Sequence, residues 1–144
     1  MKQFTHQLRI QTKGKGFYEF TREIARWLRE VSGQGHSGAG LLTVFCQHTS
    51  ASLVIQENAD PDVLSDLSDF FDRLVPEDTK LYRHTAEGLD DMTSHIRSAL
   101  TQNQLAIPIH EGKLALGTWQ GVYLFEHREQ PHRRSVILHA LLDG

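Results

Sequence analysis

Three histidines lie near the ends of this chain's predicted elements, beside small or acidic residues that have no evident packing role. His48 follows an apolar run, His84 lies in the polar stretch YRHTAEG, and His95 follows Asp91 by four residues. That spacing places Asp91 and His95 on one face of a helix. Imidazoles gathered beside a carboxylate suit a divalent metal, or an acid–base pair that titrates near neutral pH. Taken singly, each histidine fits a surface or structural role better, and only their shared setting favours a site.

The stretch QHTSASLVIQENADP, residues 47–61, interrupts the pattern of an apolar strand. It places His48 and the hydroxyl of Ser50 at a strand end, returns to apolar residues, and then presents Asn58 and Asp60. Asp60 followed by Pro61 is a strong helix start, because the carboxylate can cap the helix and proline suits its first position. We expect this stretch to form one wall of a site, in which Asp60 acts as a helix cap alone or also faces the site.

The segment GTWQG, residues 117–121, puts glycines inside a predicted strand. Glycine at such a position usually marks a bulge or the close approach of another backbone or a ligand. Gly117, Thr118 and Gln120 are harder to explain by packing alone, so they are candidate site residues. Trp119 is predicted to pack in the core.

The polar loop EHREQPHRR, residues 126–134 with the strand start, concentrates arginines beside Glu126. Arginine binds phosphate through two parallel hydrogen bonds, so the loop could form an anion pocket. A solvated loop tip is an equal alternative for Arg128 and Arg133. Arg134, at the start of the last strand, is better placed to point at a fixed partner.

Hydrophobic periodicity predicts an α+β fold. Alternating or apolar runs indicate strands at 2–11, 41–46, 51–56, 104–109, 114–126 and 134–142, and helical spacing indicates helices at 20–31, 60–75 and 91–100. A glycine-rich stretch, 32–40, connects the first helix to the next strand. We predict one domain over 1–144, with a mainly antiparallel curved sheet or sandwich and about three helices packed on it.

Composition limits the class of protein. A chain of 144 residues can bury a core without disulfides or structural metals. The single cysteine, Cys46, points to a reducing compartment. A formal net charge of −3 argues against non-specific nucleic-acid binding, which needs cations to neutralise phosphates. No apolar run reaches the roughly 18 residues of a membrane span. We expect a cytoplasmic protein without a nucleic-acid or membrane partner.

Read in order, the strings QHTSASL, ENADP, YRHTAEGLDDMTSHIRS, GTWQG and EHR…RR resemble the motifs of the YjbQ family, and the resemblance covers essentially the whole chain. It implies a small α+β protein that assembles as a homotrimer. It also implies the activity called secondary thiamine-phosphate synthase, which joins a pyrimidine pyrophosphate to a thiazole phosphate to give thiamine phosphate. The family positions carried onto this chain are His48, Ser50, Asn58, Asp60, His84, Asp90, Asp91, His95, Gly117, Thr118, Gln120, Glu126 and Arg134.

The expectation is therefore an enzyme that acts on a phosphorylated small molecule. His48, His84, His95 and Asp91 are the expected catalytic residues, and the three histidines are also the expected ligands of a divalent metal, Mg²⁺ or Zn²⁺. The residues expected to bind substrate are Ser50, Asn58, Gly117, Thr118, Gln120, Glu126 and Arg134, the last through phosphate. Two alternatives stay open, a module that binds a metal or phosphorylated metabolite without turnover, and a metal-dependent phosphate-ester hydrolase.

Overall fold

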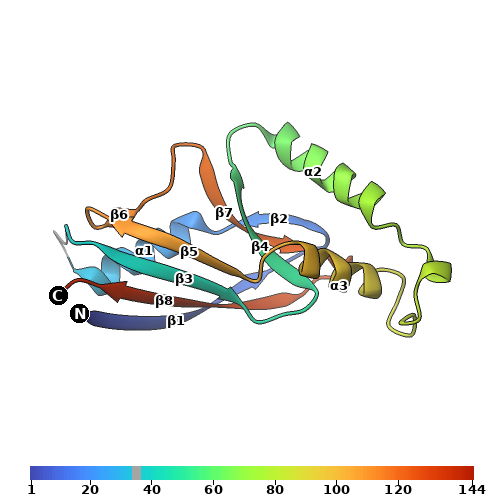
Figure 1. The fold of residues 1–144 in the computed structure, drawn as a ribbon, viewed down its shortest axis with the longest axis horizontal. Helices are drawn as coiled ribbons and strands as arrows, with labels where there is room; N and C mark the ends of the chain where they lie inside the picture. The colour runs from blue at the N-terminus through green and yellow to red at the C-terminus, as the bar shows by residue number, and fades with distance from the viewer. Residues whose placement is uncertain (34–36) are drawn as a thin grey trace.

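The structure, a computed structural model, describes residues 1–33 and 37–144. Within those residues, two antiparallel sheets and three α-helices form a single α+β domain, which confirms the predicted fold class (Figure 1). One sheet has the strand order β1-β8-β3-β5-β6, and the other has the order β2-β7-β4. The elements are β1 (Lys2–Gln11), β2 (Gly16–Glu19), α1 (Thr21–Ser32), β3 (Gly40–Cys46), β4 (Ala51–Glu57), α2 (Pro61–Leu74), the 3₁₀ turn η1 (Thr79–Leu81), α3 (Asp91–Leu100), β5 (Gln104–His110), β6 (Lys113–Leu114), β7 (Gln120–Glu126) and β8 (Arg133–Leu142).

The core gathers buried residues of α1, of one face of the five-stranded sheet, and of strands β4 and β7 of the other sheet. Strand β3 alternates as a strand with one buried face should, with Leu42 and Val44 fully buried and Leu41 partly exposed. Helix α1 turns Ile24 and Leu28 onto that face, because apolar residues at helical spacing form one stripe. The predicted glycine-rich connection falls partly on residues 34–36, which lie outside the described residues.

The ladder between β4 and β7 defines two ends of the molecule. Ala51 lies opposite Glu126 at one end, and Glu57 lies opposite Gln120 at the other. Six residue steps separate these pairs, which corresponds to about 20 Å along the strands. The two ends therefore carry different parts of the predicted site.

Helix α2 begins where the sequence predicts, and the Oδ1 atom of Asp60 accepts a hydrogen bond of 2.9 Å from the backbone N–H of Asp62. Pro61 occupies the first turn, as expected for a proline without a donor. Figure 1 shows α2 standing away from both sheets, and no residue of this helix is buried. Its main aromatic contact with the sheets is Phe71, whose ring lies 5.2 Å from that of Phe125 at an edge-on angle.

The strand predicted at 114–126 was wrong, because the structure divides it into β6 and β7. A turn separates them, in which the backbone N–H of Gln120 donates to the carbonyl of Gly117 at 3.1 Å. The side-chain oxygen of Gln120 accepts the N–H of Gly117 at 2.7 Å and fixes the same turn. Trp119 therefore sits at a turn with 62% of its surface exposed, so the expectation of a core tryptophan was also wrong.

Two short elements were not predicted, the strand β2 and the turn η1. Strand β2 has four residues, too few for an alternation to be recognised in the sequence. It is held by pairing with β7, where Phe17 stacks on Phe125 at 4.1 Å between ring centres. Among the described residues, no helix is long and apolar enough to cross a membrane.

Candidate active site

Helix α3 and the loop before it bring two of the predicted histidines onto one carboxylate. Asp91 begins α3, and His95 follows one turn later on the same face. The Oδ2 atom of Asp91 lies 3.1 Å from Nε2 of His95 and 2.6 Å from Nε2 of His84, which comes from the loop after η1. The three candidate ligand atoms all lie within 4.8 Å of one another.

The partners of His95 and Asp91 orient both side chains towards this cluster. The Nδ1–H of His95 donates to the carbonyl of Thr49 at 2.9 Å, so a neutral His95 presents the lone pair of Nε2 to the cluster. The other oxygen of Asp91 accepts from the guanidinium of Arg128. In each residue, one polar atom is hydrogen-bonded to a neighbour outside the cluster, and the other points at the centre of the cluster. Such supporting hydrogen bonds are usual around metal ligands.

Arg128 also stabilises Asp90, which precedes the helix. Its Nε donates to Oδ2 of Asp90 at 3.1 Å, and the backbone N–H of Glu129 donates to the same oxygen at 2.8 Å. Burial alone would raise the pKa of Asp90, but these hydrogen bonds and the Arg128 charge outweigh it and hold that pKa below its usual value. A single arginine thus supports two adjacent carboxylates at the start of α3.

The charges of the cluster favour a cation at its centre. Burial raises the pKa of Asp91, but hydrogen bonds from His84 and the other neighbours outweigh it, so the net pKa is lowered. The hydrogen bond to Asp91 in turn raises the pKa of His84 above its usual value. Asp91 is therefore ionised at neutral pH and attracts a positive charge, either a proton on His84 or a metal ion.

His48 occupies a different position, outside the cluster of His84, Asp91 and His95. Its Nε2 accepts the backbone N–H of Ser135 at 2.8 Å, and its Nδ1 lies 3.4 Å from Nη1 of Arg134. Burial, followed by the charge of Arg134, lowers the pKa of His48. The neutral ring therefore carries its proton on Nδ1, beside a guanidinium. The predicted role of His48 as a metal ligand stays a prediction, and its one free nitrogen faces a cation.

Arg134 and Glu126 form a buried ion pair with two hydrogen bonds, of 2.6 and 2.8 Å. The Nη2 atom of Arg134 also donates to Oγ and the carbonyl of Ser50, at 3.1 and 3.2 Å. The Nη1 atom finds no oxygen acceptor among the described residues, and its only polar neighbour there is His48. Two donors thus face each other across a gap, and we call this pair, Arg134 Nη1 and His48 Nδ1, the donor pair.

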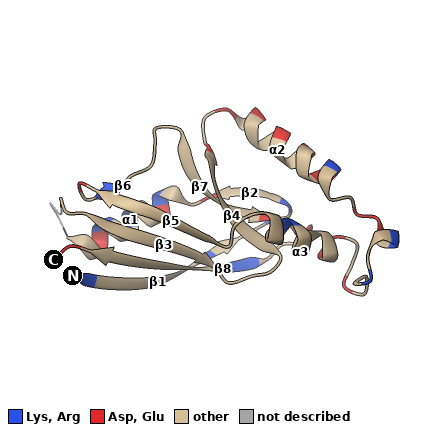
Figure 2. Ribbon diagram, in the orientation of Figure 1, with Lys and Arg blue, Asp and Glu red and all other residues tan. Residues whose placement is uncertain are grey.

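The donor pair and the cluster of His84, Asp91 and His95 lie on either side of one short segment, residues 48–50. Thr49, whose carbonyl holds His95, lies between His48 and Ser50 in the chain. Figure 2 shows basic positions at the start of β8, at the end of the molecule where α3 lies. The structure therefore brings together most of the predicted residues, namely His48, Ser50, His84, Asp91, His95, Glu126 and Arg134.

The remaining predicted residues lie at the other end of the β4–β7 ladder. Gln120 pairs with Glu57 there, and the backbone N–H of Asn58 donates to the carbonyl of Trp119 at 3.0 Å. Gly117 and Thr118 belong to the same turn. Within one chain these residues are about 20 Å from Glu126, so their role in binding substrate stays a prediction.

Sequence reasoning missed two groups at the site. For Arg128, the sequence favoured a solvated loop position and an anion pocket equally, and nothing in it indicates that the side chain reaches back to Asp90 and Asp91. His127 is almost fully buried, and its Nε2 lies 2.9 Å from Oγ of Ser52. Burial, followed by nearby arginines, lowers the pKa of His127 to about 3. Both contacts join residues far apart in the chain, which periodicity cannot show.

The comparisons with known proteins agree with the motifs. The family model described as UPF0047 protein YjbQ-like matches residues 6–143. The UPF0047 protein sll1880 of Synechocystis is 56% identical over 140 residues, covering 96% of this chain and 91% of the relative. The UPF0047 protein YjbQ of Escherichia coli O157:H7 is 42% identical over 137 residues, covering 95% of each chain.

A solved structure shows the same architecture. The conserved hypothetical protein TT1486 of Thermus thermophilus superposes with a TM-score of 0.78 at 34% identity, over 92% of this chain and 97% of its own. The family indicated by the sequence motifs is thereby confirmed. This chain belongs to the YjbQ (UPF0047) family.

Proposed function

We propose that this protein is a metal-dependent enzyme that acts on a phosphorylated small molecule at the site of His84, Asp91 and His95. The observation that carries the proposal is the convergence of two imidazole nitrogens and one carboxylate oxygen within 4.8 Å. Such a set of three protein ligands leaves coordination positions open for water or substrate, which is typical of catalytic metals.

The residues fit a metal such as Zn²⁺ better than Mg²⁺. Zn²⁺ accepts imidazole nitrogen readily, whereas Mg²⁺ prefers oxygen ligands. Ligand atoms about 2.1 Å from a tetrahedral metal lie about 3.4 Å apart, so the 2.6 Å contact between His84 and Asp91 would open by about 0.8 Å. His84 can move in this way because it lies in a loop with 43% of its side chain exposed.

A phosphorylated substrate is supported by the donor pair. Arg134 Nη1 and the Nδ1–H of His48 both need an acceptor, and one phosphoryl oxygen placed between them would accept from both. Glu126 keeps Arg134 in place and neutralises part of its charge. When bound, a divalent cation at the neighbouring cluster would polarise a second phosphate oxygen or the leaving group.

The reaction that we propose to test first is the formation of thiamine phosphate, as the family resemblance implies. Loss of pyrophosphate from a benzylic-type carbon needs positive charge around the leaving group, which His48, Arg134 and a cation would supply. Hydrolysis of a phosphate ester is the second candidate, because the exposure of His84 leaves the cluster open to water. The protein is also proposed to be cytoplasmic and to work as a homotrimer.

The test combines metal binding with turnover. Protein stripped with a chelator is titrated with Zn²⁺ by calorimetry, and thiamine phosphate and inorganic phosphate are then assayed with and without the metal. His95→Ala is expected to weaken Zn²⁺ binding by at least tenfold and to abolish turnover. His110→Ala is the matched control, because His110 is 78% exposed and remote from the cluster in the sheet.

Each outcome separates the candidates. Thiamine phosphate formed by the wild type and lost in His95→Ala supports the transferase, and phosphate release without that product supports the hydrolase. Zn²⁺ binding at the cluster without either product would reduce the proposal to a binding module. Zn²⁺ affinity and activity that His95→Ala leaves unchanged would contradict the site altogether.

A further inference from the structure

A hollow lies at the end of the molecule away from the histidine cluster. It has a volume of about 320 Å³ and lies between α1 and the segment around β6. Its walls are apolar, formed by Ala25 and Leu28 of α1 and by Leu114 and Leu116. Leu114 and Leu116 are half-buried, so they present apolar surface to the hollow as well as to the core.

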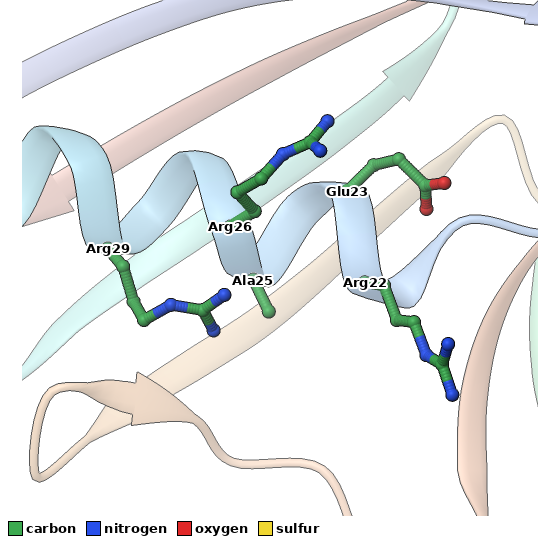
Figure 3. A pocket seen from close by; sticks show the side chains of 5 residues that line it. All are labelled: Arg22, Glu23, Ala25, Arg26 and Arg29. Atoms are coloured by element: carbon green, nitrogen blue, oxygen red, sulfur yellow. The ribbon is translucent and has the colours of Figure 1, made fainter.

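The charged groups around this hollow are all basic. Arg29 and Lys113 line it, and none of its lining residues is acidic, although the whole chain has a net charge of −3. A shallow depression on α1, which also contains Ala25 and Arg29, adds Arg22 and Arg26, together with the acidic Glu23. Figure 3 shows Arg22, Ala25 and Arg29 pointing to one side of α1, opposite Arg26 and Glu23. In the described part of the chain, no carboxylate lies within 4.0 Å of the charged nitrogens of Arg29 or Lys113.

A polar group from the GTWQG motif also reaches this hollow. Gln120 lines it, and its side-chain oxygen is held by the N–H of Gly117 at 2.7 Å. The orientation of the amide is therefore fixed, and its Nε2 has no acceptor within the described ranges. Gln120 thus offers an oriented donor to the hollow that also holds Arg29 and Lys113.

We propose that this hollow is a binding site for a small organic carboxylate with an apolar body. The apolar walls take the body, and Arg29, Lys113 and the Gln120 amide, which also line the hollow, are the groups that can pair with the carboxylate. Charge complementarity favours an anion, because an anionic ligand can pair with both cations, whereas a neutral molecule gains no such attraction. A volume of about 320 Å³ is at the lower end for ligand pockets, which suits a small metabolite.

This site is separate from the proposed catalytic centre and does not depend on it. The turn that holds Gln120 lies about 20 Å along the β4–β7 ladder from Glu126. The GTWQG segment thereby acquires a role within a single chain, apart from any substrate at the histidine cluster. Strand β7 joins the two sites directly, since it runs from Gln120 to Glu126.

The experiment is a nuclear magnetic resonance titration of the full-length ¹⁵N-labelled protein with 1-naphthoate. Naphthoate has one carboxylate and an apolar body, and 1-naphthamide supplies the same body without the charge. The backbone signals of Ala25, Gly112 and Gln120 are expected to shift, while those of Asp91 and His95 stay in place. Naphthamide is expected to bind at least tenfold more weakly, because hydrogen bonds to a charged group contribute on that scale.

Matched variants test the cations. Arg29→Gln with Lys113→Gln is expected to weaken naphthoate binding about tenfold or more. Arg26→Gln with Lys80→Gln removes the same charge from the opposite side of α1 and from η1, and is expected to change binding less than twofold. Equal effects of the two pairs, equal binding of naphthamide, or shifts confined to other regions would overturn the proposal.

Discussion

The histidines around the candidate site differ in which ring nitrogen is occupied. His95 uses Nδ1 for a backbone carbonyl, whereas His48 uses Nε2 for a backbone N–H. His127 bonds Ser52 through Nε2 and has no partner for its buried Nδ1 among the described residues. His84 and His95 both direct a nitrogen at Asp91, so these two fit a shared metal, whereas His48 and His127 have other partners and lie outside that group.

Buried His127 predicts a loss of stability in acid. Its pKa is about 3 in the folded protein against 6.5 for the free side chain, so the unfolded chain binds the proton more tightly. The stabilisation is complete above pH 6.5 and is lost as the pH falls towards 3. We expect the free energy of unfolding to fall by about 1 kcal/mol per pH unit between pH 6 and 4.

The variant His127→Gln isolates this effect, because glutamine can still bond Ser52 but does not titrate. Urea unfolding at a series of pH values should show a smaller slope for the variant. Part of the slope will remain, since the pKa values of His48, Asp90 and Asp91 are also lowered in the folded protein. The raised pKa of His84 has the opposite effect: it stabilises the folded protein below about pH 6.5, and that stabilisation is lost as the pH rises further. It therefore adds little to the slope between pH 6 and 4. An identical slope in both proteins would contradict the prediction.

Glu126 and Arg134 predict a second effect at this scale. Both residues are buried, at 0% and 4% exposure, so removing one charge leaves the other buried without its charged partner. We expect Glu126→Gln to lower the free energy of unfolding by about 3 kcal/mol, measured by urea denaturation at pH 7. The double variant with Arg134→Met should recover most of that loss. If the double variant is no more stable than Glu126→Gln, the pair does not act as proposed.

At the scale of elements, the central strand β3 tolerates no side chain at its first residue. A Cβ atom built on Gly40 would lie 2.3 Å from the backbone carbonyl oxygen of Leu141, and the backbone on β8 cannot give way easily. We therefore expect Gly40→Ala to destabilise the protein by about 1–3 kcal/mol in thermal or urea unfolding. Gly117→Ala is the control, because its Cβ would meet only the flexible end of Gln120 at 3.4 Å. Equal losses in both variants would remove this explanation.

The sequence predicts elements whose signal is local. The alternation of β3 and the Asp60-Pro61 start of α2 were read correctly because each depends on neighbouring residues. The break between β6 and β7 was missed, since it depends on how the Gln120 side chain bonds Gly117. The contact between α3 and the loop after β7 was not predicted for a similar reason, because Arg128 and Asp91, which bond each other, are 37 positions apart in the chain.

The site shows the same division between local and distant signals. The Asp91 and His95 pair follows from spacing on one helix, so it could be predicted. The distance of Gln120 from Glu126 also follows from the sequence, because six residues of one strand span about 20 Å. Which end of that strand meets the histidines could not be predicted, because it depends on contacts between distant residues, such as that of His95 with the carbonyl of Thr49.

At the scale of the whole molecule, one face of the five-stranded sheet has no cover among the described residues. In Figure 1, α1 lies behind β3 and β8, so these strands turn their other face to the viewer. That face carries Leu41 and Phe45, which are 38% and 40% exposed, opposite the half-buried Leu141 and Ile137. Thr43 and His139 lie between these pairs on the same face, so the apolar part is a patch. Such an exposed apolar patch fits burial against a second copy of the chain.

The proposed homotrimer makes this surface testable. Phe45→Glu with Leu41→Glu places two charges on the apolar face without changing its buried side, so the fold should persist while association is lost. Sedimentation equilibrium is expected to give three times the mass of 16.4 kDa for the wild type and a single copy for the variant. Trp119→Glu is the control, because it adds one charge at an apolar residue that is still more exposed, on another part of the surface. A monomeric wild type would contradict the trimer, and a trimer that survives the double variant but not Trp119→Glu would move the interface to the GTWQG turn.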